Sequence, residues 1–98
     1  MRVMMKIQIP TQKGSAALRD GSLPQLIQST LERTKAEAAY FTVEGGQRTG
    51  FIFFNMEDQA HVPMLGEPIF EGLEAKIDVT PCMTVDDLQR GLSLLRAG

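Results

Sequence analysis

The chain has 98 residues and a net charge of −2, with 43% hydrophobic and 22% charged residues. This length and balance predict one globular domain over residues 1–98 rather than a disordered chain. The slightly acidic charge argues against a nucleic-acid partner, which favours basic surfaces. A single cysteine, Cys82, excludes an internal disulfide, and no Cys/His cluster indicates a metal site. With no leader pattern and no apolar run long enough to span a bilayer, we expect a cytoplasmic protein without a membrane partner.

The first third of the chain predicts a strand followed by a helix. Apolar residues alternate with more polar ones from Val3 to Ile9, which is typical of a half-buried strand, and Pro10 ends it. Residues 13–20 predict a turn or a short helix that ends at Gly21. Ser22 then suits a helix N-cap, and apolar residues at helical spacing predict a helix over 23–35.

The middle of the chain predicts a β-hairpin. Residues 37–43 and 48–56 are strand-like, and the Gly45-Gly46 pair suits a two-residue turn in which both residues have positive φ. In that register Tyr40 lies opposite Phe51. The strand over 48–56 is apolar on both faces, which favours a central place in the sheet.

The last third predicts a helix, a strand and a terminal helix. Residues 61–72 are helical by their apolar spacing, but Pro63 and Pro68 are expected to limit them to short pieces. The alternation that starts at Leu73 predicts a fourth strand, which stops at Pro81. The terminal helix has a capping box and an apolar stripe, made respectively by Thr84 with Asp87 and by Leu88, Leu92 and Leu95.

The element order βαββαβ plus a terminal helix predicts an α+β, ferredoxin-like antiparallel sheet. Right-handed crossovers place the first and third strands in the centre and both main helices on one face. The other face would stay open, with Met4, Lys6, Gln8, Tyr40, Thr42, Phe51, Phe53, Lys76 and Asp78 on it. Its aromatic rings would form an unusual patch on a monomer. A second copy of the chain, the terminal helix or a ligand would cover it.

Two functional hypotheses follow from this open face. In the first, a homodimer encloses a cavity between two sheets and binds a small organic molecule there, with or without catalysis and without a bound cofactor. Tyr40 would then offer a phenol, Lys6 or Lys76 would orient an anion, and Phe51, Phe53 and Met4 would be walls. In the alternative, a non-catalytic structural or interaction module uses the face only as a dimer interface.

Several residues are explained more simply by a structural role than by catalysis or ligand binding. His61 is predicted to be a polar residue at a helix start, and Cys82 a small packed residue. Lys6, Lys76 and Asp78 are expected to pair across the strands. The aromatic segment 48–54 resembles the third strand of RNA-recognition domains, but the acidic charge and the Met4 position argue against RNA.

Nearly the whole chain resembles a known group of proteins. The motifs are Glu37-Ala38-Ala39-Tyr40-Phe41-Thr42, Arg48-Thr49-Gly50, Ala75-Lys76, and Pro81-Cys82-Met83-Thr84 with Asp87-Leu88. They resemble a small bacterial family of uncharacterised proteins in the dimeric α/β-barrel superfamily. The resemblance implies a ferredoxin-like homodimer. It carries over no activity, because the superfamily includes cofactor-free monooxygenases, lactone isomerases, haem proteins and stress-induced proteins.

Overall fold

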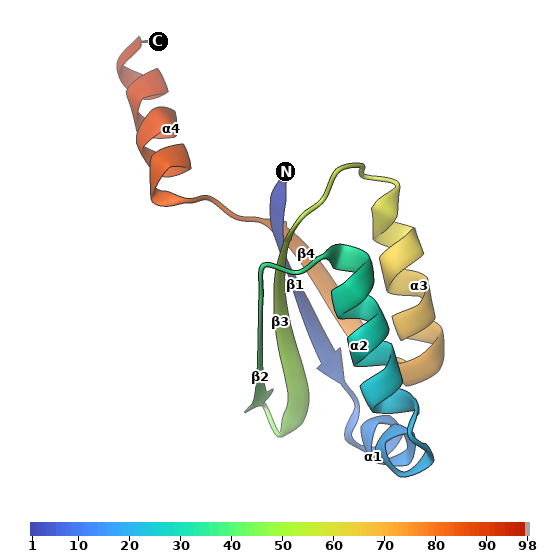
Figure 1. The fold of residues 1–98 in the computed structure, drawn as a ribbon. Coiled ribbons are helices and arrows are strands. Elements are labelled where there is room, and N and C mark those ends of the chain that lie inside the picture. Colours follow the sequence, from blue (N-terminus) through green and yellow to red (C-terminus); the bar gives the residue numbers. More distant parts are fainter. Residues whose placement is uncertain (98) are drawn as a thin grey trace.

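The computed structural model describes residues 1–97 and shows an α+β fold (Figure 1). In chain order the elements are β1 (Arg2–Ile9), α1 (Thr11–Asp20), α2 (Ser22–Thr34), β2 (Ala38–Glu44), β3 (Gln47–Asn55), α3 (His61–Leu73), β4 (Lys76–Pro81) and α4 (Val85–Ala97). The strands form one antiparallel sheet in the order β2-β3-β1-β4. The prediction that the first and third strands are central is confirmed.

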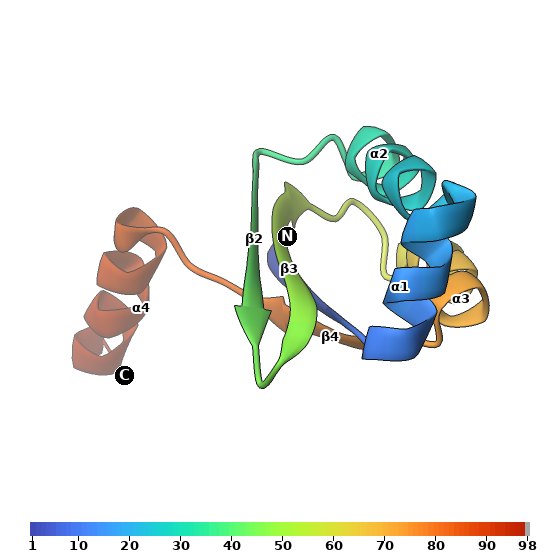
Figure 2. The ribbon, with the colours of Figure 1, turned by 90° about the horizontal axis from the view of Figure 1, so that it is seen from below.

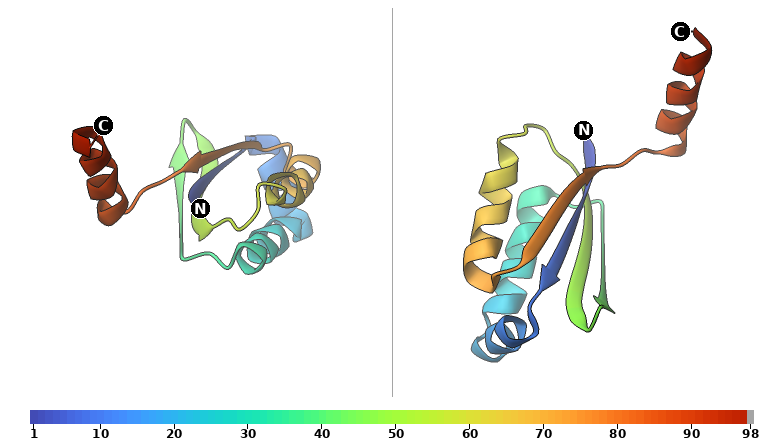
Figure 3. Two further views of the ribbon diagram at one scale, coloured as in Figure 1. Left: turned by 90° about the horizontal axis from the view of Figure 1, so that it is seen from above. Right: turned by 180° about the vertical axis from the view of Figure 1, so that it is seen from behind.

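The helices divide unequally between the two sides of the sheet. Figures 2 and 3 show α1, α2 and α3 together on one face, while α4 stands off on the opposite side. The prediction that the main helices share one face is confirmed. Within residues 1–97, no helix has both the length and the apolar character needed to cross a membrane.

The core lies between this face and α1–α3. Strand alternation sends every second residue of β1 and β3 toward the helices, and the largest fully buried side chains are Val3, Met5, Ile52 and Phe54. Full burial of such a side chain contributes about 1.5–3 kcal/mol. These residues therefore fix which face of the sheet receives the helices.

The hairpin has the predicted register. Gly45 and Gly46 both have positive φ, 59° and 76°, as the two-residue turn requires. Tyr40 pairs with Phe51, and Phe41 pairs with Gly50. Because side chains alternate along a strand, this register fixes which residues lie on the open face.

The predicted N-cap at Ser22 is wrong. The segment before it is a full helix, α1, and only Gly21, with φ 86°, separates α1 from α2. Ser22 is therefore already the first residue of α2. The Asp20 carboxylate accepts the Ser22 backbone N–H at 2.8 Å, so an acidic side chain satisfies a donor at the start of the helix.

The two prolines do not break α3, which corrects the prediction of short helical pieces. Pro63 lies in the first turn, where a backbone N–H has no partner within the helix anyway. Pro68 lies inside the helix and removes one hydrogen bond. Burial of Leu65 and Ile69 against the sheet offsets that loss.

The fourth strand begins later than predicted. Leu73 is the last residue of α3, Glu74 adopts a left-handed conformation with φ 51°, and β4 starts at Lys76. Leu73 and Ala75 are both buried. A helix end and a strand start can therefore produce the same alternation of apolar residues.

Candidate functional site

The open face of the sheet collects the residues singled out from the sequence. Across its middle, Tyr40 pairs with Phe51, Phe51 with Lys6, and Lys6 with Asp78. The neighbouring rows are Ala38, Phe53, Met4 and Thr80 on one side, and Thr42, Thr49, Gln8 and Lys76 on the other. Strand parity therefore brings Met4, Lys6, Tyr40, Thr42, Phe51, Phe53 and Lys76 to one surface.

The aromatic side chains of this face contact one another and a lysine. The Tyr40 and Phe53 rings meet edge-on with centroids 6.4 Å apart. The Lys6 Nζ lies 5.8 Å from the Phe51 ring centroid, within reach of a cation–π interaction. Tyr40 is 66% exposed, and the two phenylalanines are half-buried. The face is thus an ordered apolar surface without a cover from its own helices.

The pairing expected among Lys6, Lys76 and Asp78 across the strands is wrong, since no ion pair joins any two of them in the described part of the chain. The Lys6 ammonium instead meets the Glu44 carboxylate at 3.0 Å, although Asp78 is its backbone partner on β4. The long lysine side chain leans over the Phe51 ring toward the end of β2, which carries its charge away from β4. An exposed pair of this kind contributes at most about 1 kcal/mol.

A hollow lies on the other face of the sheet, between α2 and the β2–β3 hairpin. Its volume is about 230 Å³. Its walls are almost entirely apolar, with Ile7, Ile9, Leu23, Leu26, Ile27, Phe41, Ile52, Ile69 and Leu73 among them. We call it the α2 pocket. Thr42, predicted for the open face, also borders it.

The α2 pocket exists because the helices do not cover β2. Strand alternation puts Phe41 on the helix side of the sheet, but it is 54% exposed, and Val43 further along β2 is exposed as well. Helices α1–α3 pack over the centre of the sheet and leave this edge strand free. The Phe41 ring therefore forms an outer wall.

Gly50 allows that wall to form. A Cβ at Gly50 would lie 3.0 Å from a carbon of the Phe41 ring, which is tighter than ordinary contacts. Without a side chain, β3 lets the ring lie against its backbone. The predicted hairpin register already placed Phe41 opposite Gly50, but it did not show that the ring packs on the glycine, although a glycine inside a strand is a known signal of close approach.

The side chain of Arg48 lines part of the α2 pocket. The Arg48 guanidinium is directed at α1, where it donates to the Thr11 carbonyl and the Ser15 hydroxyl, both at 3.4 Å. It makes no ion pair with an acidic residue in the described part of the chain. Gly14 leaves room for the Arg48 guanidinium, since a Cβ at Gly14 would lie 2.8 Å from Arg48 Nη1. Most of the five guanidinium donors thus remain available.

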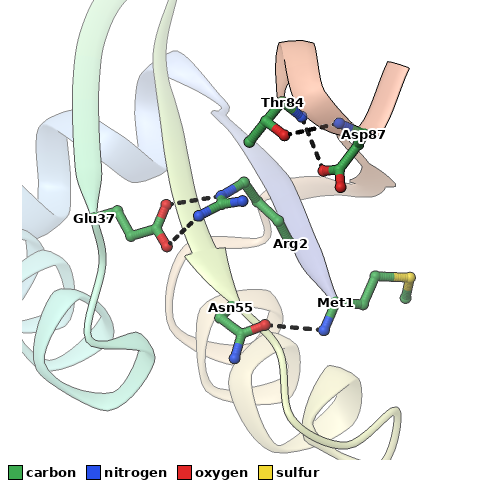
Figure 4. Close-up of polar contacts among 6 residues, drawn as sticks. All are labelled: Met1, Arg2, Glu37, Asn55, Thr84 and Asp87. Carbon is green, nitrogen blue, oxygen red and sulfur yellow. Dashed lines mark hydrogen bonds and ion pairs between the residues drawn. The ribbon is translucent and has the colours of Figure 1, made fainter. Parts of the chain in front are cut away.

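Polar contacts gather at the end of the sheet where the chain leaves for α4 (Figure 4). The Arg2 guanidinium donates twice to the Glu37 carboxylate, both at 2.9 Å. That hydrogen bonding lowers the pKa of Glu37 and raises the pKa of Arg2. Both groups are exposed, so the pair orders the two strand ends without isolating a reactive charge.

The remaining chemical candidates lie apart from the pocket. His61 is the first residue of α3, as predicted, and borders a separate polar cleft with Glu37 and Asn55. Cys82 is half-buried just after β4. Within residues 1–97, no three His, Cys, Asp or Glu side chains gather in a way that could hold a metal ion.

Comparisons with protein-family models, with curated proteins and with solved structures found no match for this chain.

Proposed function

We propose that this chain is a homodimer of the dimeric α/β-barrel kind that binds a small organic anion with an apolar body in the α2 pocket. One observation carries the proposal: Arg48 lines an apolar hollow, and its guanidinium, held against α1 beside that hollow, pairs with no carboxylate of the described chain. Ligand sites typically combine apolar walls with a few polar groups that set the orientation. A carboxylate is the natural partner of a guanidinium because their geometries match.

The proposal puts the ligand on the helix side of the sheet rather than between the sheets of two copies. Sheets that pack face to face lie about 10 Å apart, and the side chains of the two faces interdigitate in that space. Met4, Phe51 and Phe53 would then fill the interface. In this proposal the open face pairs two copies of the chain, and Tyr40 and Lys76 lie within that contact.

The size of the α2 pocket limits the ligand. At roughly 30 Å³ for each water-sized group, a volume of about 230 Å³ holds about eight non-hydrogen atoms. That is enough for a medium-length alkyl chain or a single ring. Octanoate, with its chain inside and its carboxylate beside Arg48, is therefore a suitable probe.

An NMR titration tests the binding site. Octanoate should shift the methyl signals of Ile7, Leu26 and Ile27, and octanol should bind at least about tenfold more weakly because it lacks the charge. Arg48→Met should remove this preference. Lys6→Met, which removes a cation from the open face, is the matched control and should leave octanoate binding unchanged. Equal octanoate affinity of Arg48→Met and the unsubstituted chain would contradict the proposed site.

Light scattering tests the dimer separately. Phe53→Asp places a charge in the proposed contact and should produce monomers. Val43→Asp places the same charge on the opposite face of the sheet, at a residue that is already exposed, and should leave dimers. A dimeric Phe53→Asp variant would show that the open face is not the interface.

A further inference from the structure

Helix α4 is formed but unpacked. It has 13 residues, and an isolated helix of that length is only marginally stable in water. Its apolar stripe, which we define as Val85, Leu88, Leu92 and Leu95, is between 45% and 77% exposed. These residues recur at helical spacing, so they lie along one side of the helix. The stripe needs a surface that its own protomer does not provide in this arrangement.

The connection to β4 directs α4 away from its own sheet. The Cys82 backbone N–H still donates to the Arg2 carbonyl at 3.1 Å, so the chain is tied to β1 up to that residue. Thr84 already belongs to the capping box: its N–H donates to Asp87 Oδ2 at 3.0 Å, and its hydroxyl accepts the Asp87 N–H at 3.1 Å. Only Met83 lies between these two fixed points. Figures 1 and 3 show the result, a helix projecting beyond the end of the sheet.

The open face is too large for α4 to cover alone. Four strands about 4.8 Å apart and about 23 Å long present a face of roughly 440 Å². A helix of 13 residues is about 20 Å long and about 10 Å wide, so it covers roughly 200 Å². If α4 folded back on its own sheet, more than half of the aromatic face would still be exposed.

A membrane surface does not fit α4 either. Helices that lie in a membrane interface are rich in Lys and Arg on their polar side. In α4, Asp86 and Asp87 balance Arg90 and Arg96. The helix therefore has no net positive charge to draw it to acidic lipids.

The area required by a stable dimer favours a second copy of this chain. Two open faces in contact would bury roughly 900 Å², below the 1,200–2,000 Å² of a typical specific interface. Each α4 covers part of the partner's open face, which is already counted, and adds roughly 200 Å² of its own surface, so two α4 helices would raise the total to roughly 1,300 Å², within the typical range. The open face and α4 together thus provide the buried area of a typical specific interface, although neither does so alone.

We infer that α4 is an arm exchanged between two copies: each α4 lays its apolar stripe against the margin of the partner's open sheet face. The inference rests on the homodimer proposed above and adds the element that completes its interface. The capping box agrees with this role, because it favours the helical form of α4 without a tertiary contact.

Two matched substitutions test this arm. Leu92→Asp introduces a charge into the apolar stripe and should raise the dimer dissociation constant roughly thirtyfold or more, the effect of losing a central interface residue. Leu94→Asp introduces the same charge on the opposite side of α4, where the side chain is also exposed. It should change the constant less than about threefold. Analytical ultracentrifugation of the full chain measures both.

Hydrogen exchange of the α4 amides distinguishes a partner from a fold-back. If a second copy protects α4, the protection should fall at least about tenfold when the protein is diluted from well above to well below its dissociation constant. Protection that is independent of concentration would overturn the inference, as would equal effects of the two substitutions in a chain that still dimerises. A full chain that remains monomeric would overturn the proposed dimer as well, whereas octanoate binding is measured independently of both.

Discussion

Helices α3 and α4 are alike in length and unlike in environment. Each has 13 residues and one apolar stripe. In α3 the stripe residues Leu65, Ile69 and Leu73 are at most 5% exposed, whereas every leucine of α4 is exposed. Strands precede and follow α3, which hold it over the sheet, whereas the short connection from β4 leads α4 away from the sheet. An apolar stripe thus shows that a helix needs a surface, while the path of the chain decides which surface it meets.

The two helices also differ in what stabilises them. Helix α3 has no side-chain cap, no acidic residue in its first turn, and Pro68 in its interior. Helix α4 has a complete capping box, Asp86 and Asp87 at its positive end, and Arg96 in its last turn. Tertiary packing therefore stabilises α3, although its sequence offers no cap and contains an internal proline. In α4, by contrast, the capping box and the terminal charges favour the helix without tertiary contacts.

The largest effect expected from this difference is on global stability. Ile69→Ala removes a fully buried side chain from α3 and should lower the free energy of unfolding by about 2–5 kcal/mol. Leu92→Ala makes a similar deletion in α4 and should lower it by less than about 0.5 kcal/mol in the monomer. Urea denaturation at a protein concentration below the dimer dissociation constant compares them. Equal losses would mean that α4 packs on its own protomer.

A smaller effect is expected at the capping box. Thr84→Ala removes the hydroxyl that accepts the Asp87 N–H and should destabilise α4 by about 1 kcal/mol. Ser22→Ala, at the start of α2, removes a hydroxyl that contacts the Asp20 side chain but caps no backbone N–H of its helix, and serves as the control. Carbon chemical shifts should show fraying of α4 in the first variant only, with the sheet signals unchanged. A loss of sheet signals in Thr84→Ala would mean that α4 is coupled to the core.

The register of the sheet could be predicted because two local signals agree on it. Gly45 and Gly46 fix the turn, and the alternation from Val3 to Ile9 fixes the buried side of β1. A shift of one residue would have exposed the whole core side. The open-face residues Tyr40 and Phe51 were therefore placed correctly from parity alone.

The α2 pocket could not be predicted in the same way. It depends on how far α2 extends over the sheet, which is a matter of helix packing rather than of local pattern. Strand alternation puts Phe41 on the core side of the sheet, yet it forms an outer wall of the pocket because the helices leave the edge strand β2 uncovered. Pro68 does not end α3 as predicted, because tertiary packing overrides the local preference of proline against a helix.

The smallest effect expected is a response of α4 alone to acid. The Thr84 backbone N–H, and after it the Thr84 hydroxyl and Arg90, lowers the pKa of Asp87 below its usual value of about 3.9. A carboxylate with a lowered pKa stabilises the folded form above its unfolded value and loses this contribution as the pH falls through the folded value. Amide shifts of residues 85–88 should therefore change below about pH 4, while those of residues 62–65 in α3, whose first turn has no acid, should not. Asp87→Asn keeps an acceptor that does not titrate and should reduce this response of the α4 amides, although Asp86 stays in the first turn. Parallel changes in α3 and α4 would instead show that acid unfolds both helices together.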